Sequence, residues 1–191
     1  MSLLDDLLAG LTSGDESRAE AAASELVHLG DPALARLMDL LGSTDADQRW
    51  WAIRTLAQIP VVDAGMFLAA LNDPSAEVRQ ASALALAAHP LERAAPQLVR
   101  ALNDADGMVA TLAVNALIAI GKPAVPALLD AFESSSRAVQ INRMRALAEI
   151  RDHRSIPAML KATEADSAML NYWAKEGLER LGLNMVYIKP E

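Results

Sequence analysis

The 191-residue sequence has no cysteine, few aromatic residues and no long apolar run. The absence of cysteine excludes disulfides, thiolate metal sites and catalysis by a thiol nucleophile. Aromatic residues make up 4% of the chain and hydrophobic residues 52%, so a core must be filled mainly by Ala, Leu, Val, Ile and Met. Ala, Leu and Met have high helix propensity, whereas strands favour β-branched and aromatic residues. The composition therefore favours an all-helical protein.

Basic residues are also scarce, because 17 Lys and Arg stand against 25 Asp and Glu and give a formal net charge of −8. A nucleic-acid-binding surface needs basic residues to neutralise phosphates, and the sequence shows no basic cluster, so we do not expect nucleic acid as a ligand. No apolar run reaches the roughly 18 residues that span a bilayer. The first ten residues, MSLLDDLLAG, have acids where a secretory signal carries Lys or Arg. We expect a soluble, cytoplasmic protein without a membrane segment.

One leucine recurs every 30 or 31 residues, which is typical of a repeat protein. The repeated leucines are Leu26, Leu56, Leu86, Leu117, Leu147 and Leu178. Eleven residues before each of them stands an Asp or Ser, whose side-chain oxygen can cap the first turn of a helix. The predicted caps are Asp15, Asp45, Ser75, Asp106, Ser136 and Ser167. The two columns predict a capped helix, here named helix B, in each of six repeats.

A second helix, here named helix A, precedes helix B in each repeat. Its column comprises Leu11, Leu41, Leu71, Leu102, Phe132 and Thr163. A short turn such as Asn72-Asp73-Pro74 joins the two helices, and Gly or Pro ends helix B in five of the six repeats. We predict six αα-hairpins, or twelve helices, in a single domain over residues 1–182. The repeats are expected at about 2–30, 31–60, 61–90, 91–121, 122–151 and 152–182, followed by a tail at 183–191.

Two segments carry a resemblance to a known family: the start of helix B at Asp73–Arg79, DPSAEVR, and its Ala-rich end at Ala116–Gly121, ALIAIG. They resemble the HEAT-repeat family, and more narrowly the short HEAT-like repeats of the phycobilisome lyase type. The resemblance covers nearly the whole chain. It implies an all-α fold, a right-handed α-solenoid (superhelix) of about six HEAT-like αα-hairpin repeats, with the B helices lining its concave surface. For function it implies a class that includes chromophore lyases, assembly factors and peptide-binding scaffolds.

The sequence contains no recognisable catalytic or metal-binding motif. It has no Gly-rich phosphate loop and no GxSxG motif, and acidic pairs such as Asp45 and Asp47 lie at helix starts, where they favour the helix dipole. His28, His89 and His153 occupy different positions in the repeat, so they do not form a facing set of metal ligands. We predict no catalytic residue, no metal site and no cofactor.

The outward face of helix B is the candidate binding site. Offsets of −9, −6, −2 and +1 from the repeated leucine lie opposite the core side of the helix, where a merely solvated face would be polar. Instead, these offsets carry aromatic, Met and Arg residues with polar groups between them, the types enriched at binding hot spots. The candidate partner-binding residues are Trp50, Arg54, Gln80, Leu84, Met108, Thr111, Asn115, Ile141, Arg145, Met169 and Tyr172. The alternative is that they pack against neighbouring repeats or against a second copy of the chain.

Two aromatic pairs, Trp50-Trp51 and Tyr172-Trp173, occupy equivalent offsets four repeats apart. We expect Trp50 and Tyr172 to be exposed, and Trp51 and Trp173 to be buried between repeats. Trp50 and Arg54 are four residues apart on one helix, so we expect the guanidinium to lie over the indole in a cation–π contact.

Arg143 interrupts a column of Ala and Ser that lies four residues before the repeated leucine. A buried charge needs a partner. Either the stem of Arg143 packs while its head reaches solvent, or its head meets a carboxylate or another anion together with Arg145 and Asn142.

These patterns lead to a functional prediction. We expect a non-enzymatic scaffold, monomeric or weakly homodimeric, that binds a protein or peptide segment along the concave surface lined by the second helix of each repeat. One alternative is a lyase- or chaperone-type subunit that seats a bilin or another hydrophobic cofactor, as the resemblance implies. Another is a structural protein that forms homodimers through its apolar strip.

Overall fold

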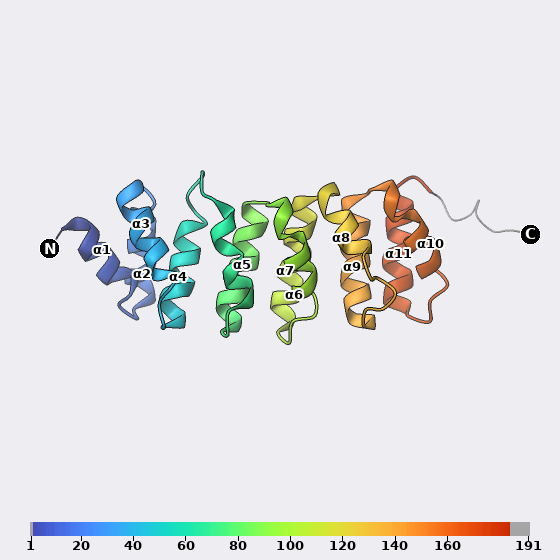
Figure 1. Cartoon of the computed structure of the whole chain (residues 1–191), viewed down its shortest axis with the longest axis horizontal. Coiled ribbons are helices and arrows are strands. Elements are labelled where there is room, and N and C mark those ends of the chain that lie inside the picture. Colours follow the sequence, from blue (N-terminus) through green and yellow to red (C-terminus); the bar gives the residue numbers. More distant parts are fainter. Residues whose placement is uncertain (1, 184–191) are drawn as a thin grey trace, which may run out of the picture. The chain divides into compact units, whose positions relative to one another are not determined.

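The computed structural model describes residues 2–183, and over this range the chain forms eleven α-helices, five short 3₁₀ segments and no strands (Figure 1). The all-α prediction is confirmed. The chain divides into two compact units, Met1–His89 and Pro90–Glu191, each of which holds three of the repeats. The single domain over residues 1–182 stays a prediction.

The first unit contains repeats one to three. Its elements are α1 (Leu3–Leu11) and α2 (Glu16–Leu26), α3 (Asp31–Leu40) and α4 (Ala46–Leu56), then the 3₁₀ segments η1 (Ala64–Phe67) and η2 (Ala69–Asn72) with α5 (Ala76–Ala88). The B helices of this unit are α2, α4 and α5.

The second unit contains repeats four to six, and a short 3₁₀ segment precedes each helix A. Its elements are η3 (Glu92–Ala94), α6 (Ala95–Ala101) and α7 (Gly107–Ile120), then η4 (Lys122–Ala124), α8 (Val125–Leu129) and α9 (Arg137–Ile150), then η5 (His153–Ser155), α10 (Ile156–Ala162) and α11 (Ala168–Arg180). The B helices of this unit are α7, α9 and α11.

Both repeated columns have the roles predicted for them. Each of the six Asp and Ser residues accepts a hydrogen bond through its side-chain oxygen from a backbone N–H at the start of its B helix. All six repeated leucines are fully buried. Burying one leucine stabilises the fold by about 1.5–3 kcal/mol relative to leaving it exposed. The cap therefore begins each B helix, and the leucine anchors that helix to the core.

Helix A of the third repeat differs from the prediction, because it consists of the 3₁₀ segments η1 and η2 rather than an α-helix. Gly65 lowers the helix propensity of this stretch. The buried hydroxyl of Ser82 also donates a 2.7 Å hydrogen bond to the carbonyl of Phe67. The amide of Leu71, which an α-helix would direct to that carbonyl, donates instead to Leu68. The hydroxyl of Ser82 on helix B thus occupies the carbonyl of Phe67, which in an α-helix would accept the hydrogen bond from the amide of Leu71.

Arg143 occupies the position of Ser82 in the fifth repeat and acts in the same way. It is 8% exposed, and its Nη1 donates to the carbonyls of Leu128 and Asp130, where the short helix α8 ends. Carbonyls at a helix end lack intrahelical partners, so a donor from a neighbouring helix satisfies them. Burial lowers the pKa of Arg143, and the charge of Asp130 opposes that shift. The prediction that the Arg143 head reaches solvent or binds a carboxylate or another anion is wrong, because backbone carbonyls of the same repeat accept its hydrogen bonds.

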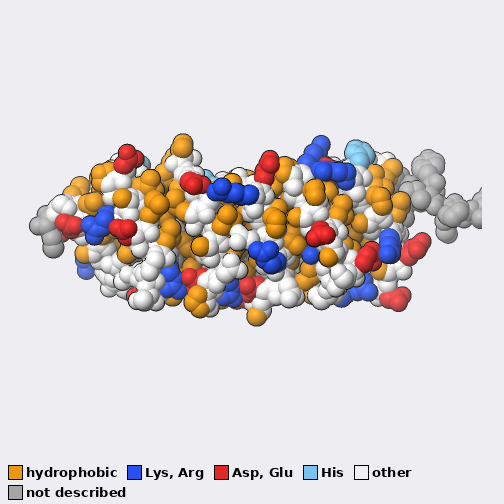
Figure 2. Space-filling view, viewed as in Figure 1, with side chains coloured by type: hydrophobic (Ala, Val, Ile, Leu, Met, Phe, Trp, Pro, Cys, Tyr) orange, Lys and Arg blue, Asp and Glu red, His pale blue; other side chains and the backbone are white. Residues whose placement is uncertain are grey.

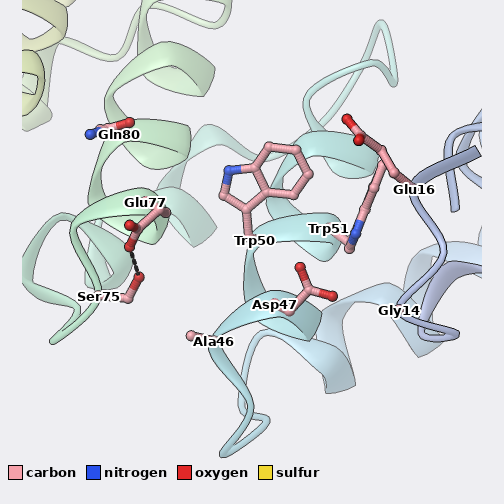
Figure 3. A pocket seen from close by; sticks show the side chains of 9 residues that line it. All are labelled: Gly14, Glu16, Ala46, Asp47, Trp50, Trp51, Ser75, Glu77 and Gln80. Atoms are coloured by element: carbon pink, nitrogen blue, oxygen red, sulfur yellow. Dashed lines mark hydrogen bonds between the residues drawn. The ribbon is translucent and has the colours of Figure 1, made fainter.

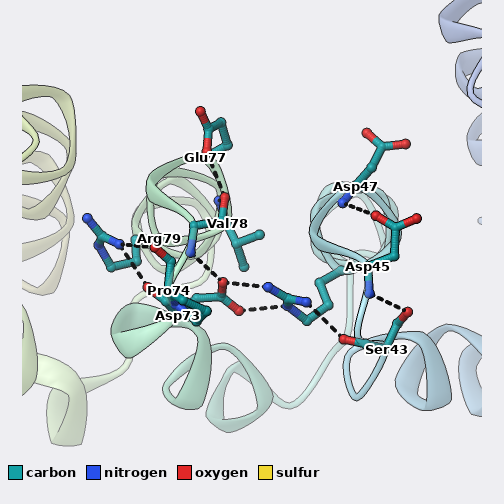
Figure 4. A network of polar contacts seen from close by, with 10 residues as sticks. Ser43, Asp45, Asp47, Asp73, Pro74, Glu77, Val78 and Arg79 are labelled. Atoms are coloured by element: carbon teal, nitrogen blue, oxygen red, sulfur yellow. Dashed lines mark hydrogen bonds and ion pairs between the residues drawn. The ribbon is translucent and has the colours of Figure 1, made fainter.

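An ion pair joins the second and third repeats of the first unit (Figure 4). Arg49 donates through Nε and Nη2 to the two carboxylate oxygens of Asp73, each at 2.7 Å, and through Nη1 to the carbonyl of Ser43 at 2.9 Å. The side chains of the pair are only 13% and 9% exposed. The hydrogen bonds from Arg49 lower the pKa of Asp73. This two-pronged contact fixes the turn of one repeat to helix B of the repeat before it.

The ends of the B helices show one irregularity. Gly121 follows α7 with a φ of 75°, a conformation that favours glycine, and Arg151 occupies the equivalent position after α9 in the left-handed region, with a φ of 57°. Arg151, with a ψ of 50°, is in the αL region, which is strained for a residue with a side chain, whereas Gly121 has a ψ of −140° and shares only the positive φ.

Within residues 2–183 no single helix is long and apolar enough to cross a membrane, and α7 with the stretch Lys122–Leu129 meets the criterion only as a pair bent by 116°. The tail predicted at 183–191 lies outside the described residues, except for Leu183.

Candidate functional site

The outward face of the B helices carries the eleven candidate partner-binding residues, and none of them is buried. Those of the first unit are Trp50, Arg54, Gln80 and Leu84, and those of the second are Met108, Thr111, Asn115, Ile141, Arg145, Met169 and Tyr172. The members within each unit form a face of their own, and their role in binding stays a prediction.

A groove of about 600 Å³ opens around Trp50 on the first unit (Figure 3). The residues that give it its chemical character are Glu16 from α2, Asp47, Trp50 and Trp51 from α4, and Glu77 and Gln80 from α5. Figure 3 shows the indole of Trp50 standing between Glu77 and Gln80 on one side and Trp51 and Glu16 on the other. Two of the candidate partner-binding residues, Trp50 and Gln80, therefore line the same groove.

Arg54 covers part of the indole, as the sequence predicts. Its guanidinium lies 5.2 Å from the ring centre of Trp50 and 5.6 Å from that of Trp51. The same guanidinium pairs with the carboxylate of Glu20 at 2.9 Å. The charge of Arg54, one of the candidate partner-binding residues, is thus already paired within the chain.

The two aromatic pairs are buried to different degrees. Trp51 is 5% exposed, as predicted, and meets Trp50 edge-on with 4.8 Å between the ring centres. Trp50 is half-buried rather than fully exposed, because Trp51 and Arg54 cover part of it. Trp173 is also only half-buried, and the prediction of its burial is wrong, because no further repeat follows α11 within residues 2–183 to cover it.

The face of the second unit is more apolar. The large hydrophobic side chains exposed there include Met108, Met169 and Tyr172, with 55%, 52% and 52% of their surfaces exposed. The Arg145 guanidinium lies 5.8 Å from the ring centre of Trp173, which also meets Tyr172 edge-on. Across the side of the molecule seen in Figure 2, hydrophobic side chains lie among acidic and basic ones. The second unit therefore offers apolar contact area to a partner on this face.

The distribution of charge between the units is a feature that the search for motifs missed. Residues 1–89 contain 5 Arg and no Lys against 13 Asp and Glu, which gives a formal charge of −8. Residues 90–191 contain 12 Lys and Arg against 12 Asp and Glu, which gives zero. A running charge along the sequence would have shown this, and it places the whole net charge in the unit that carries the Trp50 groove.

No group of three His, Asp or Glu side chains that could hold a metal ion occurs in the part of the chain that the structure describes. His89 ends α5, and its Nε2 lies 2.8 Å from the carbonyl of Ala57, which is a structural contact of a helix end.

A family model for HEAT repeats matches residues 64–139. The chain is 33% identical over 147 residues to an uncharacterized phycocyanin operon protein Z of Pseudanabaena tenuis (strain PCC 7409), and the match covers 72% of each protein. It is 38% identical over 84 residues to phycocyanobilin lyase subunit beta of the same organism, which covers 44% of this chain. The chain spans only 30% of the length of that subunit.

A solved structure is similar as well: the complex of CpcE and CpcF of phycocyanin lyase from Nostoc sp. PCC7120, with a TM-score of 0.58, 23% identity, and coverage of 75% of this chain and 96% of that one. At this identity the likeness shows the fold alone. Together, the capped repeats and these matches show that the chain is an α-solenoid of the HEAT-repeat family, with short HEAT-like repeats of the phycobilisome lyase type.

Proposed function

We propose that the chain is a non-enzymatic scaffold that binds a segment of another protein on the outward face of its B helices. The observation that carries this proposal is the groove around Trp50, an opening of about 600 Å³ beside a large aromatic ring. Tryptophan is among the residue types most enriched at interaction hot spots, and hot spots lie in pockets of this kind.

The groove is held in place before any partner arrives. Trp51 packs beneath Trp50 from the core, and Arg54, tethered to Glu20, lies over the indole. A surface that is already ordered loses little conformational entropy when it binds, so more of the contact energy is available for affinity. On the second unit, the exposed Met108, Met169 and Tyr172 supply adaptable apolar contact.

The relatives support a protein as the partner. CpcE and CpcF of phycocyanin lyase form a complex with each other, and the relative from Pseudanabaena tenuis that matches over 72% of its length is named for a phycocyanin operon. A repeat scaffold that acts through association with another protein fits the CpcE–CpcF complex.

A second candidate function is a lyase- or chaperone-type subunit that seats a bilin. The observation that favours it is the 38% identity to phycocyanobilin lyase subunit beta over 84 residues. Titration of the purified chain with phycocyanobilin, followed by visible absorbance and by tryptophan fluorescence, tests it directly. A saturable red shift that Trp50→Ala abolishes supports this role, and a spectrum identical to that of free bilin removes it.

Site-specific photo-crosslinking tests the scaffold proposal. A photoreactive phenylalanine replaces Gln80, which lines the groove, and the variant is irradiated in lysate of the source organism. We expect a discrete adduct with another protein, identified by mass spectrometry. The same photoreactive residue at Val61, which is 90% exposed outside the groove, is the matched control and should give no such adduct.

Adding Trp50→Ala to the variant with the crosslinker at position 80 tests whether the adduct forms through the groove. Loss of the adduct in a chain that melts normally supports the proposal. An adduct that survives Trp50→Ala, or that forms equally from position 61, contradicts it. An adduct of the chain with itself shows instead that the face is a homodimer seam.

A further inference from the structure

Three acidic side chains of the first unit surround the Trp50 groove. Glu16, Asp47 and Glu77 line it from the first turns of α2, α4 and α5. The carboxylates of Glu16 and Asp47 form no ion pair within residues 2–183, and Glu77 accepts a 2.6 Å hydrogen bond from the hydroxyl of Ser75. No Lys or Arg lines the groove. The groove is therefore strongly negative around an aromatic ring.

Stabilisation of the helix start does not account for these acids. An acid in the first turn favours the helix dipole, yet α7, α9 and α11 of the second unit begin without one. Where the first unit has Asp47 and Glu77, the second has Met108, Ala138 and Met169. The B helix begins directly after its capping residue with either choice. The gathering of three carboxylates around one indole therefore points to a ligand rather than to the fold.

The indole of Trp50 already contacts one cation of the chain. Arg54 stacks over it while Glu20 neutralises the guanidinium, an arrangement of a cation between an aromatic ring and a carboxylate. On the groove side, the residues that line the pocket beside this ring include Glu16, Asp47 and Glu77 and no Lys or Arg. A positively charged group of the right size would complete this side in the same way.

We infer that the Trp50 groove is the subsite for a Lys or Arg side chain of the bound protein segment. The inference rests on the proposed function and adds the chemical class of its partner, a basic segment. The cationic head stacks on Trp50 and lies among Glu16, Asp47 and Glu77. Beyond the groove, the exposed Leu84 of α5 supplies apolar contact to the rest of the segment. The net charge of −8 on this unit steers such a segment toward it.

Peptide titration tests the inference on the full chain. Fluorescein-labelled seven-residue peptides of alternating Lys and Arg, of alternating Asp and Glu, and of Ser and Gly are titrated at low salt and followed by anisotropy. The groove triple variant E16Q/D47N/E77Q is compared with the control triple D6N/E25Q/D39N. Both triples remove three negative charges from the first unit, but the control residues lie outside the groove.

We expect the basic peptide alone to bind, with about tenfold weaker affinity for the groove triple and about twofold for the control triple, because screening limits the effect of distant charges. Trp50→Leu, which keeps an apolar side chain without the aromatic face, should weaken binding about fivefold. Thermal melts confirm that each variant is folded.

Equal losses in the two triples, or undiminished binding to Trp50→Leu, would overturn the inference, because net charge alone would then explain the affinity. Absence of basic-peptide binding also overturns it. If the adduct from position 80 nevertheless depends on Trp50, the proposed scaffold function stands with a partner of different chemistry. If that adduct is absent as well, both fail.

Discussion

The two units use the same repeat and differ in what they display on it. In both, an Asp or Ser caps each B helix and a fully buried leucine anchors it. On the outward face, the first unit gathers carboxylates around Trp50, while the second exposes Met108, Met169 and Tyr172. The formal charges are −8 and zero. The caps and the core column are the elements that the fold requires, and the outward offsets are free to serve binding.

Two kinds of polar contact hold the elements of both units together. The first unit joins its second and third repeats through the ion pair of Arg49 and Asp73. In the second unit, buried donors such as Arg143 and Gln140 are directed at backbone carbonyls of their own repeats. The second unit also joins its fifth and sixth repeats through the ion pairs of Arg180 with Glu149 and Lys161 with Glu133. In the first unit, Ser82 likewise donates to a carbonyl of its own repeat, so both kinds of contact occur in each unit.

The largest expected effect tests whether the core is equivalent in the two units. Leu56→Ala and Leu117→Ala each remove a fully buried side chain, and each should destabilise its unit by about 2–5 kcal/mol. Hydrogen exchange should show lost protection around α4 in the first variant and around α7 in the second. A loss of stability and of exchange protection in only one of the two variants would show that the repeated leucines are not equivalent.

The next effect compares two donors in one column. Arg143→Ala leaves the carbonyls of Leu128 and Asp130 without their donor, and should cost about 3 kcal/mol. Ser82→Ala removes a single neutral bond to Phe67, and should cost about 1 kcal/mol. Urea unfolding measures both. A smaller loss for Arg143→Ala than for Ser82→Ala would show that relief of the buried charge outweighs the lost hydrogen bonds.

The ion pair of the first unit should make its stability depend on pH. Arg49 lowers the pKa of Asp73 in the folded protein below its unfolded value, so the stabilisation is fully present above about pH 5 and is lost as pH falls through about 4 and below. Asp73→Asn should cost about 2 kcal/mol at pH 7 and flatten this acid dependence. Urea unfolding at a series of pH values checks it, and an unchanged acid slope in the variant would contradict the assignment.

The smallest expected effect concerns the end of helix α9. Arg151 has a φ of 57°, and Gly121 ends α7 at the equivalent position. Arg151→Gly should stabilise the second unit by about 0.5–1 kcal/mol by relieving the left-handed conformation. A small rise in Tm is the readout, and a lower Tm would mean that the arginine side chain contributes more than its backbone costs.

Much of the fold could be predicted from the sequence because it follows from periodic local signals. The caps from Asp15 to Ser167 and the leucines from Leu26 to Leu178 recur at one period, and each has a role that a single helix explains. The cation–π contact of Arg54 with Trp50 was predictable for the same reason, since four residues on one helix separate them.

Contacts between helices were not predictable in this way. The partner of Arg143 depends on where α8 ends, and the two 3₁₀ segments of the third repeat depend on the bond from Ser82. The pairing of Arg54 with Glu20 crosses from α4 to α2, so neither residue reveals it by its own spacing. The groove was partly predictable, because Trp50 and Gln80 were expected on the outward face. Asp47 was explained as a helix-start residue, because the spacing along one helix does not show that it lines a groove with acids from two other helices.

The most direct test of the account compares the indoles of the two units during binding. The chain has three tryptophans, and with ¹⁵N-labelled indoles each gives its own N–H signal, which single Trp→Phe variants assign. On addition of the basic seven-residue peptide, we predict that the signal of Trp50 shifts saturably while that of Trp173 stays in place. A shift of Trp173 with Trp50 unmoved, or no shift of Trp50 at saturating peptide, would contradict the central claim that the acidic face of the first unit is the binding site.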